Sequence, residues 1–256
     1  AISLEYKLPE IDYMGSDNYS GMFDLCNHIF NVHEVSRIAF VSGPDDHEEN
    51  IIRKKALEDA MEMRGLSLTP DRIICGEWNY VETVKRLPIW LDKQKECPQA
   101  FICANDVMAM ATCAVKDRHI RVPEDCIVTG FDHLGSARRH NPKITTVDRN
   151  WQDMGYQSLI QLLKKIEGAE VPNSVLIKSM GIPAKSCGCD YMEEKRDALH
   201  MDDNGMYDHL MNVVYWGGHL CDISESMVKV TKDEELHEWF NGFLVNEHQH
   251  EGDELY

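Results

Sequence analysis

Polar side chains follow two apolar runs at the point where each run ends. The run 100–104 ends in Asn105 and Asp106, and the run 126–131 ends in Asp132. A helix-length stretch separates the runs, which predicts two parallel strands of an open α/β sheet, and such sheets bind ligands beyond the carboxyl ends of their strands. Amide and carboxylate oxygens there can hydrogen-bond to several hydroxyl groups of one small polar molecule. We therefore expect Asn105 and Asp132 to contact a ligand and Asp106 to cap the helix that follows.

Strands and helices alternate through most of the chain. Strands are predicted near residues 13–16, 37–41, 72–75, 100–104, 126–131 and 174–178, and helices near 18–30, 48–64, 80–95, 107–116 and 151–166. This alternation is typical of a parallel, doubly wound sheet with helices on both faces.

Seven short motifs occur in a characteristic order along this alternation. They are Gly15–Gly21, Arg37–Pro44, Arg53–Leu57, Ala104–Asp106, Val122–Asp125, Gly130–Asp132 and Ile144–Val147. Their order and spacing, from about residue 2 to residue 186, resemble the ligand-sensing domain of the LacI/GalR (lactose-repressor-type) transcription factors. The resemblance implies a type I periplasmic-binding-protein-like fold, in which three crossings at a hinge join two α/β lobes around a small molecule.

The same resemblance assigns residues to each lobe of a sugar-sensor domain that covers residues 1–186. Residues 37–143 and 174–183 would form the C-terminal lobe, and residues 1–36 and 146–168 would form part of the N-terminal lobe. Because the first strands and helices of that lobe have no counterpart in this sequence, we expect an incomplete first lobe that exposes apolar surface.

Residues 190–256 differ in character and predict an α-helical linker or tail. Thr231–Glu234 is a capping box. An apolar stripe at helical spacing follows, made of Leu236, Trp239, Phe240, Phe243 and Leu244. Such a stripe needs a partner, so we expect helices within 205–245. We also expect self-association through this tail or through the exposed half-lobe, most simply as a symmetric homodimer.

The resemblance implies three further ligand-binding residues. Arg53 matches an Arg that holds ligand oxygens in a bidentate manner, Trp78 lies in a loop where the family has an aromatic residue that can stack on a sugar, and Asp17 matches an acidic position that contacts sugar hydroxyl groups. Each has a purely structural alternative, namely a surface Arg, a packing Trp and a helix N-cap. Helix capping and loop hydrogen bonding are the alternative for Asn105 and Asp132.

Charge and cysteine content exclude several classes of protein. The formal net charge is −18, and from Asp190 onward there are 17 acidic and 4 basic residues. This is not the basic footprint of a nucleic-acid binder, and no helix-turn-helix is recognisable, so we expect no nucleic-acid contact by this chain itself. No apolar run approaches the roughly 18–20 residues of a membrane span. The nine cysteines lie mostly in apolar runs, which favours a reducing cytoplasm.

Neither a cofactor nor a metal is expected from the motifs. Cys187-Gly188-Cys189 supplies two ligands where a zinc site needs about four. The spacing of the nearby His200, His209, His219 and Cys221 matches no known zinc finger. The two cysteines could instead form a redox switch or an inert end of the domain. A Cys-Gly-Cys segment after the last sensor strand is similar to family members fused to signalling domains such as GGDEF diguanylate cyclases, although no GGDEF motif occurs in the sequence.

The sequence therefore favours a cytoplasmic sensing domain for a small molecule, a sugar or polyol, in a transcriptional or signalling regulator. Ligand would close the two lobes, and the change would pass to an output domain outside this sequence. The alternative is an exported sugar-binding protein of a transport system, because one fold serves both functions. The cysteines and the helical tail disfavour that alternative. No catalytic motif supports a third possibility, an enzyme on a related scaffold.

Overall fold

The computed structural model describes residues 1–115 and 120–190, which belong to one compact unit of the chain. The helices predicted within residues 205–245 lie outside the described residues, and so does the tail as a dimer interface. In the described residues 1–115 and 120–190, no helix is long and apolar enough to cross a membrane.

The larger sheet is parallel and four-stranded. Its strands are β3 (Ile38–Ser42), β4 (Ile73–Cys75), β5 (Ala100–Cys103) and β6 (Ile127–Thr129), in the order β4-β3-β5-β6. Because later strands are added on both sides of β3, the sheet is doubly wound, as the alternation of elements predicted.

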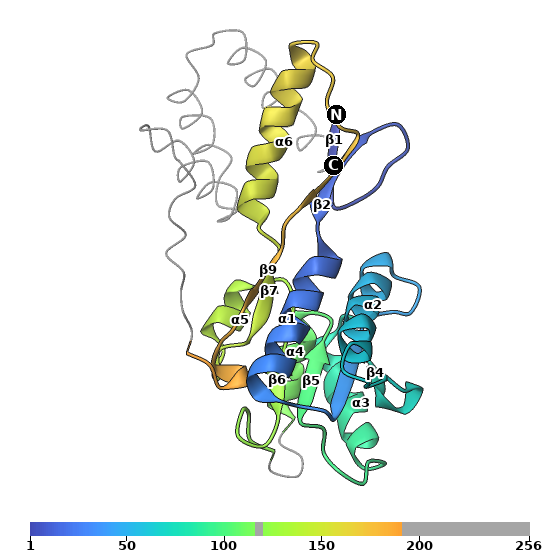
Figure 1. Cartoon of the computed structure of the whole chain (residues 1–256), viewed down its shortest axis with the longest axis vertical. Coiled ribbons are helices and arrows are strands. Elements are labelled where there is room, and N and C mark those ends of the chain that lie inside the picture. Colours follow the sequence, from blue (N-terminus) through green and yellow to red (C-terminus); the bar gives the residue numbers. More distant parts are fainter. Residues whose placement is uncertain (116–119, 191–256) are drawn as a thin grey trace, which may run out of the picture. The chain divides into compact units, whose positions relative to one another are not determined.

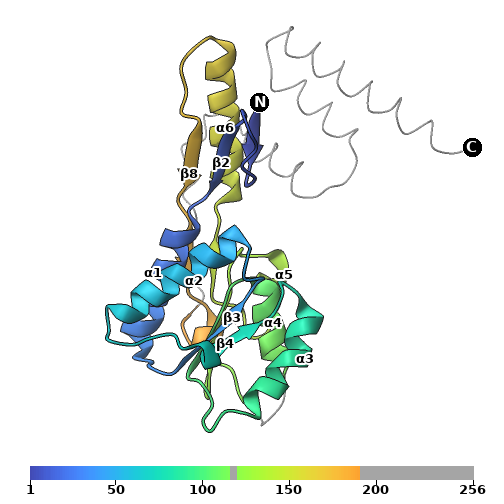
Figure 2. The ribbon, with the colours of Figure 1, turned by 90° about the vertical axis from the view of Figure 1, so that its right-hand side faces the viewer.

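Helices cover both faces of this sheet, so its strands are buried almost throughout. Figure 2 shows α1 (Asn18–His33) and α2 (Glu48–Glu62) on one face and α3 (Tyr80–Leu91) and α4 (Asp106–Ala114) on the other. The short α5 (Gly135–Arg139) follows β6, and a single 3-10 turn, η1 (Pro70–Arg72), leads into β4.

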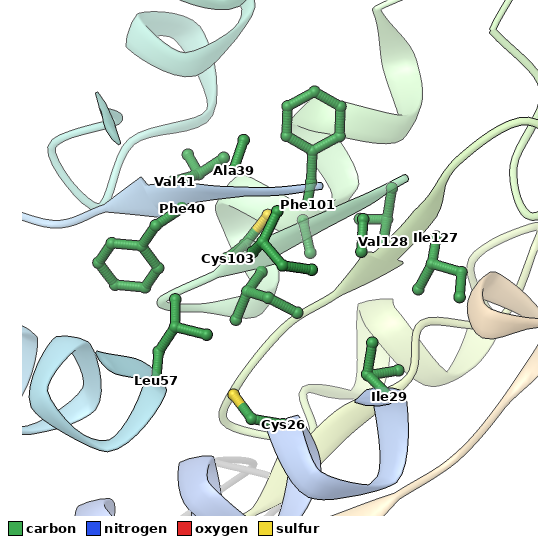
Figure 3. Packing of buried hydrophobic residues seen from close by; sticks show 14 of the residues in the cluster. Cys26, Ile29, Ala39, Phe40, Val41, Leu57, Phe101, Cys103, Ile127 and Val128 are labelled. Atoms are coloured by element: carbon green, nitrogen blue, oxygen red, sulfur yellow. The ribbon is translucent and has the colours of Figure 1, made fainter. Parts of the chain in front are cut away.

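The core of this lobe follows the alternation of side chains along each strand. Phe40 points toward α1 and α2, where Leu57 and Cys26 lie, whereas Val41 and Phe101 point to the opposite side of the sheet (Figure 3). All five side chains are almost fully buried. This packing holds the carboxyl ends of β3, β5 and β6 in fixed positions.

A smaller sheet forms the other lobe. Its strands β1 (Ile2–Leu4), β2 (Asp12–Ser16) and β8 (Ser174–Ile177) are parallel and run in the order β1-β2-β8. Helix α6 (Trp151–Ile166) packs on it through a small core of Met14, Met154 and Ile177 (Figure 1). Large apolar side chains on these elements are exposed, including Leu4, Leu159, Ile166 and Leu176.

Three segments cross between the two lobes. Ser16 and Asp17 lead from β2 into α1, residues 149–150 lead from β7 (Thr146–Asp148) into α6, and residues 178–179 lead from β8 into β9 (Met180–Ile182). β7 and β9 pair antiparallel beside the larger sheet, and a parallel bridge joins Thr145 to Thr129 of β6. A 3-10 turn, η3 (Lys185–Cys187), follows β9.

Three elements lie in a different lobe from the one that the resemblance assigned. Strand β7 falls in the range 146–168, yet it precedes the crossing and pairs with β9 beside the larger sheet. Helix α1 falls in the range 1–36, yet its buried Met22, Leu25 and Ile29 belong to the core of the larger sheet. Strand β8 falls in the range 174–183, yet it pairs with β2 in the smaller sheet. The differences arise because the first crossing lies before α1, the second lies after β7 and the third lies after β8.

A pair of substitutions on α2 tests this packing. Leu57→Ala should lower the free energy of unfolding by about 2–5 kcal/mol, because it leaves a cavity under the larger sheet. Ile51→Ala, on the exposed face of the same helix, should change it by about 0.5 kcal/mol or less. Urea denaturation of both variants checks the contrast, and equal losses would contradict the placement of α2.

Candidate ligand-binding site

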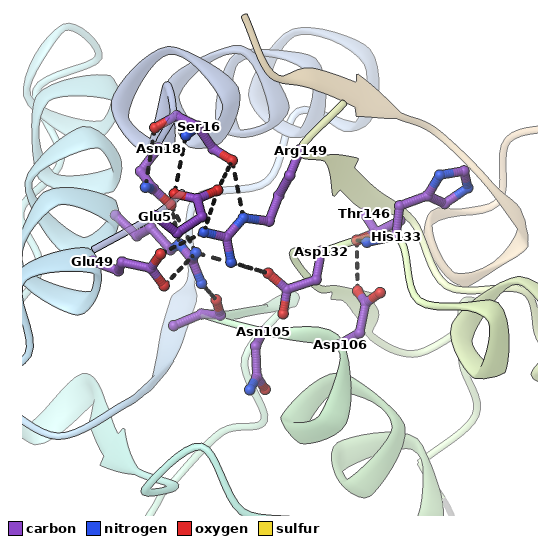
Figure 4. Close-up of polar contacts among 12 residues, drawn as sticks. Glu5, Ser16, Asn18, Glu49, Asn105, Asp106, Asp132, His133, Thr146 and Arg149 are labelled. Atoms are coloured by element: carbon purple, nitrogen blue, oxygen red, sulfur yellow. Dashed lines mark hydrogen bonds and ion pairs between the residues drawn. The ribbon is translucent and has the colours of Figure 1, made fainter. Parts of the chain in front are cut away.

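Charged side chains from both lobes converge at the carboxyl ends of the strands of the larger sheet (Figure 4). We call them the charged cluster, and they are Glu5, Glu49, Arg53, Asp132 and Arg149. Glu5 follows β1, Glu49 and Arg53 lie on α2, Asp132 follows β6, and Arg149 lies in the crossing between β7 and α6. Residues remote in sequence therefore meet where an open α/β sheet binds its ligand.

Arg53 is the most buried member, with 1% of its surface exposed. Its Nε and Nη2 donate to Asn18 Oδ1 at 2.9 and 2.7 Å, and Nη1 donates to the Ala104 carbonyl at 2.7 Å. Nη2 also donates to Glu49 Oε2 at 2.9 Å. Four of the five guanidinium N–H groups are thus paired, and the remaining Nη1 hydrogen has no acceptor among the described residues.

Two aromatic rings flank the same guanidinium. Its Cζ lies 3.8 Å from the centre of the Phe131 ring and 5.5 Å from that of Trp78, both within the range of a cation–π contact. The Trp78 indole also meets the His47 ring edge-on at 5.4 Å. Trp78 as a residue is partly buried, and its indole packs against Gly43.

Arg149 connects the two lobes. Its Nη2 lies 2.9 Å from Glu5 Oε1 and 2.5 Å from Glu49 Oε1, and its Nη1 lies 3.3 Å from Asp132 Oδ1. Its Nε donates to Ser16 Oγ at 3.1 Å. Since Ser16 ends β2 of the smaller sheet while Glu49 and Asp132 belong to the larger lobe, Arg149 pairs with groups on both sides of the crossings.

The charges of the cluster do not balance. Three carboxylates face two guanidinium groups, which leaves one formal negative charge. Burial raises the pKa of Asp132, and the neighbouring Arg53 and Arg149 only partly oppose that rise. Hydrogen-bond donors such as hydroxyl groups would relieve the excess of acceptors, whereas an anionic ligand would add to the negative charge.

Asp106 lies beside the cluster and has a structural role. Its Oδ1 is hydrogen-bonded to Thr146 Oγ1 at 2.5 Å, and its Oδ2 accepts from the Leu134 amide at 2.7 Å. Burial raises the pKa of Asp106 to about 8. The prediction that Asp106 caps α4 is wrong, because the N-cap is Asn105, whose Oδ1 accepts from the Met108 amide at 2.8 Å.

The structure brings together three of the five residues predicted from the sequence. Arg53 lies beside the other two: its Nη2 is 3.8 Å from Asp132 Oδ1 and its Cζ is 5.5 Å from the centre of the Trp78 ring. Asn105 adjoins them through Ala104 but uses its side chain as a helix cap. Asp17 caps α1 by accepting from the Ser20 amide at 2.9 Å, and within the described part of the chain it makes no contact with the charged cluster.

Sequence reasoning did not find Glu5, Glu49, Arg149 or Asn18. The spacing of Glu49 and Arg53, four residues apart on one helix, is a signal for an ion pair. Asn18 directly follows Asp17, but its type and position alone do not indicate a role. Glu5 and Arg149 carry no local signal, because their pairing depends on how the two lobes are placed.

Comparisons with known proteins are consistent with this geometry. Residues 30–186 match the family described as periplasmic binding protein-like domain. The HTH-type transcriptional repressor PurR of Histophilus somni (strain 2336) is 29% identical over 161 residues, which are 60% of this chain and 46% of PurR. The HTH-type transcriptional repressor CytR of Escherichia coli (strain K12) is 27% identical over 168 residues, 65% of this chain and 48% of CytR. The chain thus spans about half the length of the curated relatives it matches.

Solved structures share the fold. A transcriptional regulator, CelR, in complex with cellobiose superposes with a TM-score of 0.64 at 23% identity, covering 72% of this chain and 58% of CelR. The Escherichia coli transcriptional repressor ascG gives a TM-score of 0.63 at 22% identity, covering 72% and 67%. At this distance the likeness establishes the fold alone.

Replacing Arg53 tests whether the cluster depends on it. Arg53→Met should lower the free energy of unfolding by about 3–5 kcal/mol, because Glu49 and Asp132 lose a buried partner. Arg86→Met removes a half-exposed Arg of α3, which pairs with Glu82 and Glu77, and should have a much smaller effect. Urea denaturation compares the two variants. A similar loss of unfolding free energy in both would contradict the prediction that the fold depends on Arg53.

Replacing Asp106 tests its protonation. Since its pKa is about 8 in the folded protein and about 4 when unfolded, its contribution to stability is complete below about pH 4. That contribution is lost as the pH rises toward 8, by up to about 1.4 kcal/mol per pH unit. Asp106→Asn cannot ionise, so its free energy of unfolding should fall less between about pH 5 and about pH 7.5. Urea denaturation at these pH values that gave parallel slopes for both proteins would contradict the raised pKa.

Proposed function

The chain belongs to the periplasmic binding protein-like family, with a ligand-binding domain of the LacI/GalR type, and on that premise we propose that its charged cluster binds a neutral sugar or polyol. The observation that carries this proposal is the convergence of Arg53, Arg149 and Asp132 beside the partly exposed Trp78. A polyol offers hydroxyl groups that donate to carboxylates and accept from guanidinium groups. Its apolar face can lie against an indole ring.

The charge of the cluster supports a neutral ligand. Its excess negative charge favours hydroxyl donors over a phosphate or carboxylate, which would repel the three acidic side chains. Among proteins of the same fold, one regulator was solved with cellobiose, and a sugar-binding regulator from Escherichia coli was solved with phosphate. The first of these ligands fits the present cluster better than the second.

Ligand binding would work by replacing ion pairs within the protein. Arg149 pairs with Glu5 and Glu49 and contacts Asp132, so a hydroxyl-rich ligand would take over some of these partners. Because these partners come from both lobes, ligand and lobe arrangement are linked. The shift between arrangements can be no larger than the difference in affinity of the ligand for them.

The output of this sensing domain is proposed to be the control of transcription in the cytoplasm. PurR and CytR are transcriptional repressors, which favours a regulator over the alternative of an exported transport protein and over an enzyme. DNA binding and dimerisation of the whole protein are part of this proposal, as is a signalling output in place of a transcriptional one.

Substitutions of Asp132 separate ligand binding from folding. Asp132 has a φ of +105°, a conformation that favours glycine. Asp132→Gly should therefore gain about 1 kcal/mol from the backbone, which offsets part of the stability lost with the Arg53 and Arg149 ion pairs. Loss of a charge-assisted hydrogen bond should weaken sugar binding by about 1.5–3 kcal/mol, or roughly 10- to 100-fold. The probes are cellobiose, a panel of neutral monosaccharides and polyols, and their phosphate esters, first by thermal shift and then by calorimetry.

Asp132→Asn keeps the side-chain shape and Asp125→Asn provides the matched control, because Asp125 forms an exposed ion pair with Arg121. Only the Asp132 variants should lose affinity. Equal affinity of Asp132→Asn and Asp125→Asn for a bound sugar would remove Asp132 from the site. Binding of phosphate esters alone would contradict the neutral ligand, and binding of no probe would contradict a sugar of these classes.

A further inference from the structure

Four nitrogen and sulfur ligands meet at the end of α1, away from the charged cluster. They are His28, His33, Cys187 and Cys189, and their potential ligand atoms all lie within 4.8 Å of one another. The two histidines lie in the last two turns of α1, and the two cysteines lie in and just after η3, which packs beside that end of the helix (Figure 1). The sequence supplied the Cys-Gly-Cys pair, but its histidine partners come from more than 150 residues earlier.

The distances fit a tetrahedral metal site. Cys187 Sγ lies 3.8 Å from His28 Nε2, and Cys189 Sγ lies 3.5 Å from both His28 Nε2 and His33 Nε2. A tetrahedral zinc ion with Zn–S bonds of about 2.3 Å and Zn–N bonds of about 2.0–2.1 Å separates its sulfur and nitrogen ligands by about 3.6 Å. Both rings present the same nitrogen, Nε2, to the sulfur atoms, and the rings meet edge-on. The four atoms therefore surround one point with little rearrangement needed.

Backbone and side-chain contacts hold the cysteines in place. Ser186 Oγ donates to the Val128 carbonyl at 2.5 Å and accepts from the Thr145 amide at 2.8 Å. These contacts fix the residue before Cys187 against the larger sheet. Gly188 has a φ of +90°, which reverses the chain so that both sulfur atoms reach the same side. On the other side, the histidines are fixed by α1, whose apolar face is buried in the main core.

We propose that His28, His33, Cys187 and Cys189 form a closed, structural zinc site. Two thiolates and two imidazoles are a typical ligand set for structural zinc. Calcium and magnesium are disfavoured, because they prefer oxygen ligands. The ion would fasten the last turn of α1 to the chain at Cys189, one residue before the described part ends at Asp190. This site is separate from the charged cluster and does not depend on the sugar proposal.

Metal analysis of the full chain tests the site. The chain is expressed with zinc in the medium and its metal content is measured by mass spectrometry. Co²⁺ is then titrated into chelator-treated protein, because tetrahedral Co²⁺ with thiolate ligands has a distinctive visible spectrum. We expect close to one zinc ion per chain and a tetrahedral, thiolate-bound Co²⁺ spectrum. Zinc should also raise the thermal midpoint of the chelated protein.

Two variants and two controls assign the ligands. Cys189→Ser and His33→Ala should each weaken Co²⁺ binding by more than the roughly 10- to 100-fold that loss of an outer-shell contact costs. Cys75→Ser and His140→Ala lie at partly buried positions outside the proposed zinc site and should leave Co²⁺ affinity unchanged. Circular dichroism checks that all four variants fold. Equal affinity in wild type, Cys189→Ser and His33→Ala would overturn the proposal. So would a metal-free chain, whether its Cys187 and Cys189 are free thiols or a disulfide.

Discussion

The buried guanidinium group of Arg53 is the constraint on which the rest of the site depends. A charge this deep in a protein is tolerated only when it is paired and its N–H groups are hydrogen-bonded. Asn18, the Ala104 carbonyl and Glu49 meet that demand, and they come from α1, the end of β5 and α2. Satisfying one side chain thus fixes the relative positions of three elements, and Phe131 closes the ring of contacts by stacking on the guanidinium.

Arg149 has the opposite character, although it is the same residue type. Its partners are carboxylates from both lobes, its side chain is 10% exposed, and it lies in a crossing between the lobes, outside any helix or strand. On the proposal that a sugar binds here, these carboxylates stabilise the ligand-free arrangement but weaken apparent affinity, because every new contact has to replace an old one. Arg53 therefore builds the site, and Arg149 is the member whose partners can change.

Local sequence patterns predicted the sheet and the ends of its strands, but they did not predict the long-range pairings. The alternation of elements and the polar residues at 105–106 and 132 are readable because each depends on neighbours in sequence. Glu5 and Arg149 are 144 residues apart, and Cys187 is 159 residues from His28, so no periodicity links them. Asp17 shows the converse: its type suits both a ligand contact and a helix cap, and in the structure its side chain accepts a hydrogen bond from the Ser20 amide. Helix α1 was assigned to the wrong lobe because sequence order does not mark where a crossing occurs.

The length of helix α1 links two distant parts of the structure mechanically. Its first residue, Asn18, holds the Arg53 guanidinium, and its last, His33, lies beside the cysteines that precede Asp190. Sixteen residues make a rod of about 24 Å, and such a rod does not bend easily. A tilt that shifts one tip swings the other in the opposite direction, as in a lever pivoted on the core beneath its middle turns. A rearrangement of the guanidinium and a pull on the chain beyond residue 190 would thus act on opposite arms of the same rigid body.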